Sequence, residues 1–247
     1  MSLDVATPQI VHDVTIRLAG DSGDGMQLTG DRFTALAALA GNDLATLPDF
    51  PAEIRAPAGT LPGVSAFQVR IADREVTTPG DDAAVLVAMN PAALRSELHA
   101  LVPGGAILVN SDAFEERNLA KAGYATNPLT DDSLHRFKVY EIPMTSLTKD
   151  AVAPLGVKPR DAERSKNFFA LGLSSWLYTR PSEPTLNWID EKFGSKPNVA
   201  ASNHAAFHAG HAFGETAELF ENAYSIAPAV QAPGTYTNIT GNVALAW

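Results

Sequence analysis

The sequence has 247 residues, 45% of them hydrophobic and 19% charged, a balance that allows one large or two small globular domains. With 28 acidic and 18 basic side chains the formal net charge is −10, which disfavours nucleic acid and anionic lipid as partners. The lack of cysteine excludes disulfides, thiolate nucleophiles and cysteine-ligated iron–sulfur clusters on this chain.

The first residues and the apolar stretches are those expected of a cytoplasmic protein. Residues 1–12 lack the basic region and apolar run of a signal peptide, and no apolar stretch reaches the roughly 20 residues of a membrane helix. In so acidic a protein, an anionic ligand would need a local trap such as a helix N-terminus.

The chain opens with a strand, a glycine loop and a helix. Residues 14–19 alternate apolar and polar side chains as a strand does, and residues 20–25 form the loop. From 26 to 40 the apolar side chains follow helical spacing, until Gly41 and Asn42 end the helix. This order is typical of the first unit of a nucleotide-binding α/β domain.

Strands and helices continue to alternate up to residue 142. We predict strands at 44–47, 63–71, 84–89, 106–109 and 138–142, the second of them a candidate antiparallel strand. Helices are expected at 91–101 and 114–122, and a loop rich in proline and glycine at 48–62. The pattern predicts an α/β fold with a mostly parallel sheet and helices on both faces.

The character of the sequence changes after Pro143. Helical patterns follow at 165–178, 184–193 and 199–224, and the segment 225–236, with two prolines and a glycine after the last helix, is interpreted as a linker. Residues 237–247 begin something new and end on the first turn of an apolar helix. We therefore predict one domain over residues 1–224, a linker over 225–236 and a truncated second domain over 237–247.

The glycine loop is a candidate anion site. Glycines let the backbone approach a phosphate, and the amides at the start of the next helix attract an anion. The carboxylates of Asp21 and Asp24 would repel a diphosphate unless they point towards amides or a cation. Because the spacing of Gly20, Gly23 and Gly25 fits neither a Rossmann nor a P-loop pattern, a plain strand–helix turn stays an alternative.

Several ordered segments resemble the γ domain of 2-oxoacid:ferredoxin oxidoreductase α subunits. They are residues 19–25 (AGDSGDG) with 29–31 (TGD), 50–60 (FPAEIRAPAGT) with 63–70 (GVSAFQVR), 166–172 (KNFFALG) and 239–247 (ITGNVALAW). The order of these segments is specific to the family, and their details are closer to 2-oxoglutarate enzymes than to pyruvate enzymes.

The resemblance implies a Rossmann-like γ domain that binds coenzyme A in an enzyme converting a 2-oxoacid and coenzyme A to acyl-CoA and CO2. Two electrons would pass to ferredoxin. Thiamine diphosphate, Mg²⁺ and [4Fe–4S] clusters would lie on other domains or subunits. The implied partners are the pyrimidine-binding remainder of the α subunit, a β subunit that carries thiamine diphosphate and a cluster, and ferredoxin. Residues 237–247 would begin the pyrimidine-binding domain, and the catalytic residues would lie outside this chain.

The resemblance also suggests site residues. The candidates for the coenzyme A diphosphate and its surroundings are Gly20, Asp21, Ser22, Gly23, Asp24, Gly25, Met26, Arg55, Lys166 and Asn167. Those expected near the oxoacid or thiamine are Thr237, Thr240 and Asn242. Arg55 could instead pair with Glu53 or Asp49, and Asn167 could cap a helix. For Lys158 and Arg160 a solvated surface position is favoured.

Three histidines and three aromatic residues are interpreted as structural. His204, His208 and His211 share one helical face but lack accompanying acidic ligands, so no metal site is expected. The side chains of Phe168, Phe169 and Trp176 are at core spacing and are expected to pack.

Two other functions stay open for the chain. One is a nucleotide-binding module of another oxidoreductase, such as an NAD-dependent dehydrogenase, although a Rossmann glycine pattern and an acidic residue ending the second strand are not clear here. The other is a non-catalytic assembly domain with an empty loop.

Overall fold

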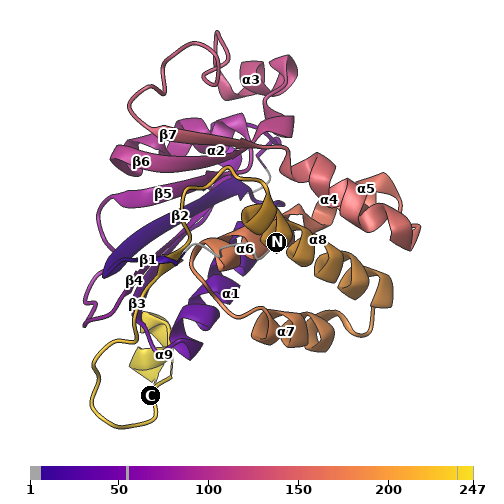
Figure 1. Cartoon of the computed structure of the whole chain (residues 1–247). Coiled ribbons are helices and arrows are strands. Elements are labelled where there is room, and N and C mark those ends of the chain that lie inside the picture. The colour runs from indigo at the N-terminus through magenta and orange to yellow at the C-terminus, as the bar shows by residue number, and fades with distance from the viewer. Residues whose placement is uncertain (1–6, 54–55, 238, 247) are drawn as a thin grey trace.

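A computed structural model describes residues 7–53, 56–237 and 239–246, and its centre is a six-stranded sheet (Figure 1). The strand order is β3–β4–β2–β5–β6–β7. The bounds are β2 (Asp13–Asp21), β3 (Asp43–Asp49), β4 (Val64–Ala72), β5 (Ala83–Ala88), β6 (Leu101–Asn110) and β7 (Lys138–Ile142). Strand β4 runs antiparallel to both β2 and β3, and the other neighbours are parallel. The predicted sheet and its antiparallel strand are confirmed.

Helices cover both faces of the sheet, as predicted (Figure 1). One face carries α2 (Pro91–Glu97) and α3 (Glu116–Ala122). The other carries α1 (Met26–Leu39), α4 (Met144–Val152), α6 (Lys166–Leu177) and α8 (Pro197–Thr216). Helix α7 (Glu183–Phe193) packs on α1 and α8. The short elements are β1 (Gln9–Ile10), paired in parallel with β8 (Tyr224–Ser225), together with α5 (Pro159–Ala162) and α9 (Gly241–Ala246).

The hydrophobic pattern of the central strands explains these two layers. Along β2, Ile16 and Leu18 face α1 and α6, while Ala19 faces α2. Strand β5 is apolar on both faces because helices cover both of them. Within the part of the chain that the structure describes, no helix is long and apolar enough to cross a membrane.

The sequence pattern misplaced one helix end in the second half of the chain. The third helix of that half ends at Thr216, not at residue 224. Glu218 adopts a positive φ of 49° after the helix end. Phe220 then packs on Tyr140 and on Trp176 with tilted rings, at 4.9 and 5.8 Å between ring centroids. Packing of one aromatic ring therefore outweighs continued helical propensity. The pattern also missed α4 and α5.

The segment after β8 is attached to the domain. The Asn42 amide donates to the carbonyls of Ile226 and Ala227 at 3.3 and 2.7 Å, and the Ala229 N–H donates to the Gly41 carbonyl at 2.9 Å. The division into a domain, a linker and a further domain stays a prediction.

Helices α6 and α8 approach each other closely through a reciprocal pair of glycines. A Cβ built on Gly172 would lie 2.0 Å from the Phe207 carbonyl oxygen, and one built on Gly210 would lie 2.0 Å from the Phe169 carbonyl oxygen. Both obstacles are backbone atoms, which cannot rotate away. The two helices therefore need glycine at both positions.

A Gly172→Ala substitution tests this contact. The methyl group would force α6 and α8 apart, and we expect the free energy of unfolding to fall by about 2–3 kcal/mol. Chemical denaturation followed by circular dichroism measures this loss. The matched control is Gly241→Ala, because a Cβ on Gly241 meets no atom within 4 Å. Equal stability of the two variants would contradict the close-packing account.

Candidate functional site

The glycine loop lies where the chain changes direction in the sheet. Strand β2 ends at Asp21, and the chain then continues to β3 on one side, while β5 neighbours β2 on the other. Met89 and Asn90 follow β5, and Asn110 ends β6, at the same edge of the sheet. Ligands of open α/β sheets bind at such a switch point, outside the carboxyl ends of the strands.

The loop leaves three backbone amides without partners in the described part of the chain. Ser22 N–H donates to the Gly63 carbonyl at 3.1 Å, and Asp24 N–H donates to the Asp21 carbonyl at 2.8 Å. For Gly23, Gly25 and Met26 no acceptor occurs among the residues described, and the first turn of α1 carries neither a side-chain cap nor an acidic residue. These N–H groups and the start of α1 form a local positive end.

Gly25 is the position where the loop requires glycine. Its φ is 75°, and a Cβ there would come within 2.8 Å of the Asn167 amide nitrogen. Asn167 is buried, its carbonyl lies 3.5 Å from the Thr29 hydroxyl, and its side chain does not cap α6. Asn167 therefore packs directly against the loop.

The two loop carboxylates are held by amides and by a cation. Both Asp21 oxygens accept the Gly59 N–H at 3.0 Å, and Asp24 Oδ2 accepts the Asp21 N–H at 2.9 Å. Asp24 Oδ1 pairs with Lys166 Nζ at 2.8 Å. This is the arrangement under which a phosphate loop tolerates acidic residues.

The environment changes the acidity of Asp21. Burial raises the pKa of this carboxyl, and the nearby charge of Asp24 raises it further, while the Gly59 N–H and Lys166 lower it. The charged form of Asp21 is therefore held at a cost in stability at neutral pH.

Two adjoining hollows open beside the loop. One, of about 650 Å³, is lined by Ser22 and Gly23 together with Arg160, Arg164 and Lys166. The other, of about 460 Å³, extends over the strand ends and is lined by Asn90, Asn110, Lys121, Lys149 and Lys166, among others. Lys149 pairs with Glu163 at 3.1 Å, and Lys121 donates to the Ala58 carbonyl at 3.2 Å. The same linings also carry carboxylates, so this edge mixes basic and acidic side chains; they are Asp21, Asp24, Asp112, Glu115 and Glu163.

The structure brings together most of the predicted diphosphate residues. Residues 20–26, Lys166 and Asn167 surround the same edge of the sheet. Arg55 lies outside the described residues, and Asp49, one of its alternative partners, pairs with Arg17 at 2.8 Å. Arg160, for which a surface position was favoured, lines the larger hollow but is exposed.

Several polar residues of the hollows were missed by sequence reasoning. Asn90 caps α2, and its amide lies 3.5 Å from Asp24 Oδ2. Its position after the buried strand β5 was a usable signal. Lys121 and Lys149 come from helices whose placement only the fold reveals.

The three residues predicted to lie near the oxoacid or thiamine are not beside the glycine loop on this chain. Thr237 and Thr240 line a hollow against α1 and β3. The Thr240 hydroxyl accepts the Val243 N–H at 3.3 Å at the start of α9, and Asn242 is exposed.

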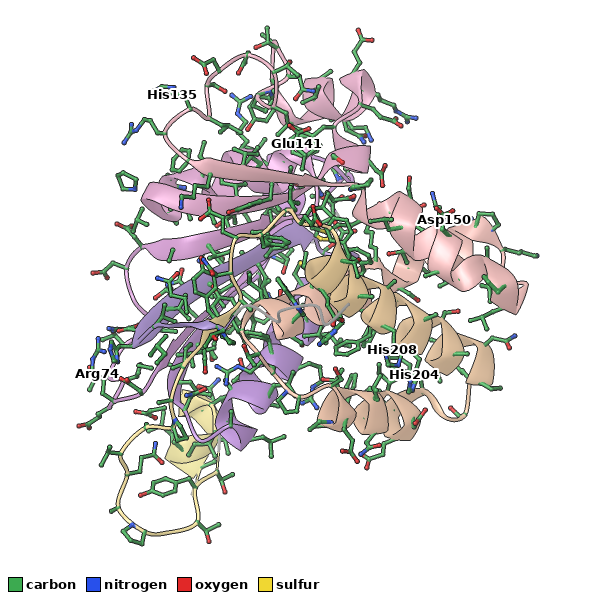
Figure 2. The ribbon with its side chains drawn as sticks, in the orientation of Figure 1. Arg74, His135, Glu141, Asp150, His204 and His208 are labelled. Atoms are coloured by element: carbon green, nitrogen blue, oxygen red, sulfur yellow. The ribbon has the colours of Figure 1, made fainter. Side chains whose placement is uncertain are left out.

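The histidine face of α8 is engaged by α7. His204 Nε2 lies 2.9 Å from Asp190 of α7, and the His208 ring is 6.5 Å from the His204 ring (Figure 2). Over residues 7–53, 56–237 and 239–246, no group of three or more potential metal ligands occurs. Phe168 and Phe169 are buried, and Trp176 packs against the same core, as predicted.

Comparisons with known proteins point to one family. The family model described as pyruvate ferredoxin/flavodoxin oxidoreductase matches residues 15–213. The 2-oxoglutarate oxidoreductase subunit KorA of Mycobacterium tuberculosis is 56% identical over 239 residues, which are 97% of this chain and 37% of that protein. The chain thus spans little more than a third of that relative.

Solved structures agree in fold. A 2-oxoglutarate:ferredoxin oxidoreductase from Magnetococcus marinus, with 2-oxoglutarate, coenzyme A and succinyl-CoA bound, matches with a TM-score of 0.67 and 28% identity, over 89% of this chain and 34% of that chain. The γ subunit of a keto/oxoacid ferredoxin oxidoreductase from Geobacter sulfurreducens matches with a TM-score of 0.54 and 20% identity, over 82% of this chain and 98% of that chain. Pyruvate oxidoreductase subunit PORC from Thermotoga maritima matches with a TM-score of 0.54 and 19% identity, over 82% and 97%. The last two show similarity of fold alone.

An Asp21→Asn substitution tests the state of the loop carboxylate. The folded protein holds the Asp21 proton to a higher pH than the unfolded chain, whose pKa is near 3.8, so the wild type loses stability as pH rises through the folded pKa. Asparagine still accepts from Gly59 without a charge. We expect the variant to be more stable than the wild type at pH 7 and the difference to disappear below pH 3.8.

Denaturant unfolding across this pH range measures the effect. The control is Asp82→Asn, which removes one charge from an exposed loop position. A destabilised Asp21→Asn variant at pH 7, or a gain equal to that of the control, would refute the account.

Proposed function

The chain belongs to the pyruvate ferredoxin/flavodoxin oxidoreductase family, and from this premise we propose that it is the coenzyme-A-binding part of a 2-oxoglutarate:ferredoxin oxidoreductase. The enzyme would convert 2-oxoglutarate and coenzyme A to succinyl-CoA and CO2 and pass two electrons to ferredoxin. The similarity to KorA supports 2-oxoglutarate as the oxoacid, and coenzyme A is bound in the relative from Magnetococcus marinus.

One observation carries the assignment to coenzyme A. The backbone amides of Gly23, Gly25 and Met26 have no acceptor among the described residues. They lie at the strand ends beside a hollow lined by Arg160, Arg164 and Lys166, and Lys166 neutralises the nearby Asp24. A diphosphate matches this combination of donors, because its oxygens accept several N–H bonds at once. The linings of the two hollows share Asp21, Asp24, Ala58, Glu163 and Lys166, so a long ligand could occupy both.

Lys166 has a specific part in the proposal. In the structure it neutralises Asp24 at 2.8 Å, and it lines both hollows. When a diphosphate arrives, the ammonium can bond a phosphate oxygen as well as the carboxylate, because it has three donors. Asn167, packed on Gly25, keeps the loop in shape. We propose Arg55 as a further phosphate partner on the resemblance alone.

The remaining chemistry is assigned to other domains or subunits. Thiamine diphosphate with Mg²⁺ would supply the carbanion chemistry, and [4Fe–4S] clusters would carry the electrons; this chain has no cysteine to hold a cluster. Its contribution is to bind and orient coenzyme A. We further propose that residues 225–236 link this domain to a pyrimidine-binding domain beginning at residue 237, whose Thr237, Thr240 and Asn242 approach the oxoacid in the assembled enzyme with its β subunit.

A Gly23→Asp substitution tests the loop as the site. A Cβ on Gly23 meets no atom within 4 Å, so the change adds a charge without disturbing the fold. We expect coenzyme A to bind at least about tenfold more weakly, because a carboxylate would face the phosphates. Isothermal titration of the chain measures the affinity, with Gly23→Asn as the control for volume.

Two results would contradict the proposal. Unchanged affinity for coenzyme A in Gly23→Asp would remove the loop from the site. Binding of NAD with no response to coenzyme A would favour a dehydrogenase-type nucleotide domain instead. A weaker effect of Gly23→Asn than of Gly23→Asp would show that the charge causes the loss.

A further inference from the structure

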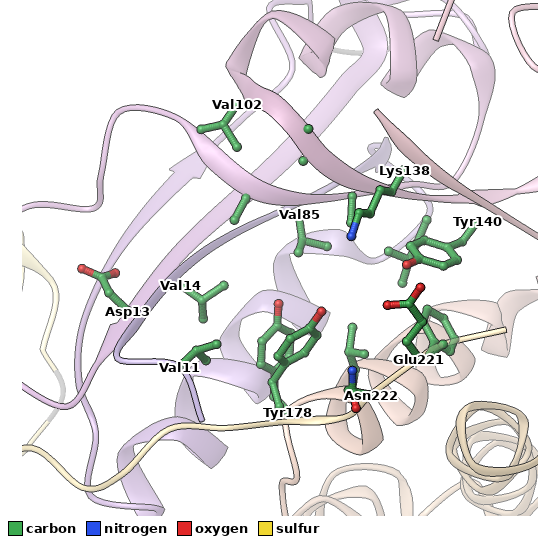
Figure 3. Close-up of a pocket in the computed structure, with 18 of the residues that line it drawn as sticks. Val11, Asp13, Val14, Val85, Val102, Lys138, Tyr140, Tyr178, Glu221 and Asn222 are labelled. Carbon is green, nitrogen blue, oxygen red and sulfur yellow. The ribbon is translucent and has the colours of Figure 1, made fainter. Parts of the chain in front are cut away.

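Figure 3 shows a separate hollow of about 300 Å³. It lies at the amino ends of the parallel strands, whereas the glycine loop follows the carboxyl end of β2. Its walls come from the beginnings of β5, β6 and β7, the end of α6 and the segment between α8 and β8. It shares no lining residue with the two hollows beside the glycine loop. It can therefore serve a function of its own.

The floor of this hollow is an aromatic pair with a free hydroxyl. Tyr178 is only 3% exposed, and its ring stacks on Tyr224 with 5.8 Å between the centroids. Its hydroxyl forms no hydrogen bond with the described residues, and it is not one of the fully buried polar atoms that lack a partner. Burial raises the pKa of Tyr178, so the phenol keeps its proton and can donate.

The backbone next to Tyr178 is strained. Thr179, a β-branched residue, adopts a positive φ of 53° directly after Tyr178. Its hydroxyl donates to the Tyr224 carbonyl at 2.7 Å, which fixes one tyrosine relative to the other. Phe33 supports Tyr178 from behind, with ring centroids 5.8 Å apart.

Two opposite charges face each other across the hollow. Lys138 and Glu221 form no ion pair within 4.0 Å, with each other or with any other group in the described part of the chain. Figure 3 shows the Lys138 ammonium and the Glu221 carboxylate directed into the space above Tyr178. Asp13, the other acidic residue of the wall, is already bound by Arg70 at 2.6 Å and Arg74 at 2.7 Å. One positive and one negative charge therefore remain for a ligand.

We propose that this hollow binds an α-amino acid with an apolar side chain. The ligand carboxylate would face Lys138, its ammonium would face Glu221, and the Tyr178 hydroxyl would donate to the carboxylate. The ligand side chain would lie against apolar wall residues, which include Val14, Val85, Leu108, Leu177 and Phe220. A zwitterion carries no net charge, so the overall charge of −10 does not repel it as it would an organic anion.

Calorimetric titration of the 247-residue chain with L-leucine and L-phenylalanine tests the proposal. We expect at least one of them to bind. Two analogues of leucine separate the contacts: 3-methylbutylamine lacks the carboxylate, and 4-methylpentanoate lacks the ammonium. We expect each analogue to bind about tenfold or more weakly than leucine, because each loses one of the two charged contacts that leucine would make.

Three variants assign the contacts. In Lys138→Met, leucine should no longer bind more tightly than 3-methylbutylamine. In Glu221→Gln, leucine should no longer bind more tightly than 4-methylpentanoate. Tyr178→Phe should weaken leucine several-fold, and the exposed positions of Lys138 and Glu221 keep the test valid if that variant does not fold. The controls are Lys192→Met and Glu191→Gln, exposed changes of the same kind on α7, which should leave binding unchanged.

Clear results would overturn the inference. The inference is wrong if the folded chain binds neither amino acid at millimolar concentration. It is also wrong if leucine and its two analogues bind equally well. Affinity that is unchanged in both Lys138→Met and Glu221→Gln would place the amino acid elsewhere. Because the two sites share no residue, none of these outcomes bears on coenzyme A binding at the glycine loop.

Discussion

The backbone contact between α6 and α8 is the constraint on which the glycine-loop site depends. Gly172 and Gly210 let the two helices meet carbonyl against glycine, so there is one axial position in which they fit together. Helix α6 also packs on α1, which begins at the glycine loop. This packing sets where α6 begins, and its first two residues, Lys166 and Asn167, are those that touch the loop. A contact deep in the core therefore determines the geometry at the surface.

The electrostatics of the loop follow from that placement. Two carboxylates next to free amides would make a poor site for an anion. Here Lys166 neutralises Asp24, and the Gly59 amide holds Asp21. The raised pKa of Asp21 shows that the compensation is incomplete, since burial outweighs the hydrogen bond. The loop is kept in shape by these bonds, at some expense of stability, while the amides of Gly23 and Gly25 stay available.

The sequence was sufficient for the first half of the fold because its signals are local. Alternation in β2, β4 and β5, a glycine-rich turn and a helix of regular spacing each depend on neighbours in the chain. The end of α8 was missed because Phe220 packs against Tyr140 and Trp176, and these residues are distant from it in sequence. The same reason applies to the site. The glycines are visible in the sequence, but the approach of Lys121 and Lys149 depends on tertiary packing.

The two ends of the parallel sheet suit ligands of different charge. At the carboxyl ends the start of α1 offers amides that attract an anion, and Lys166 neutralises Asp24 beside them. At the amino ends the hollow offers neutral phenols and two opposite charges. Such a place can hold a polar ligand only if the ligand brings its own balanced charges. The difference follows from strand direction, because β2, β5 and β6 are parallel and all deliver their helices at the same edge.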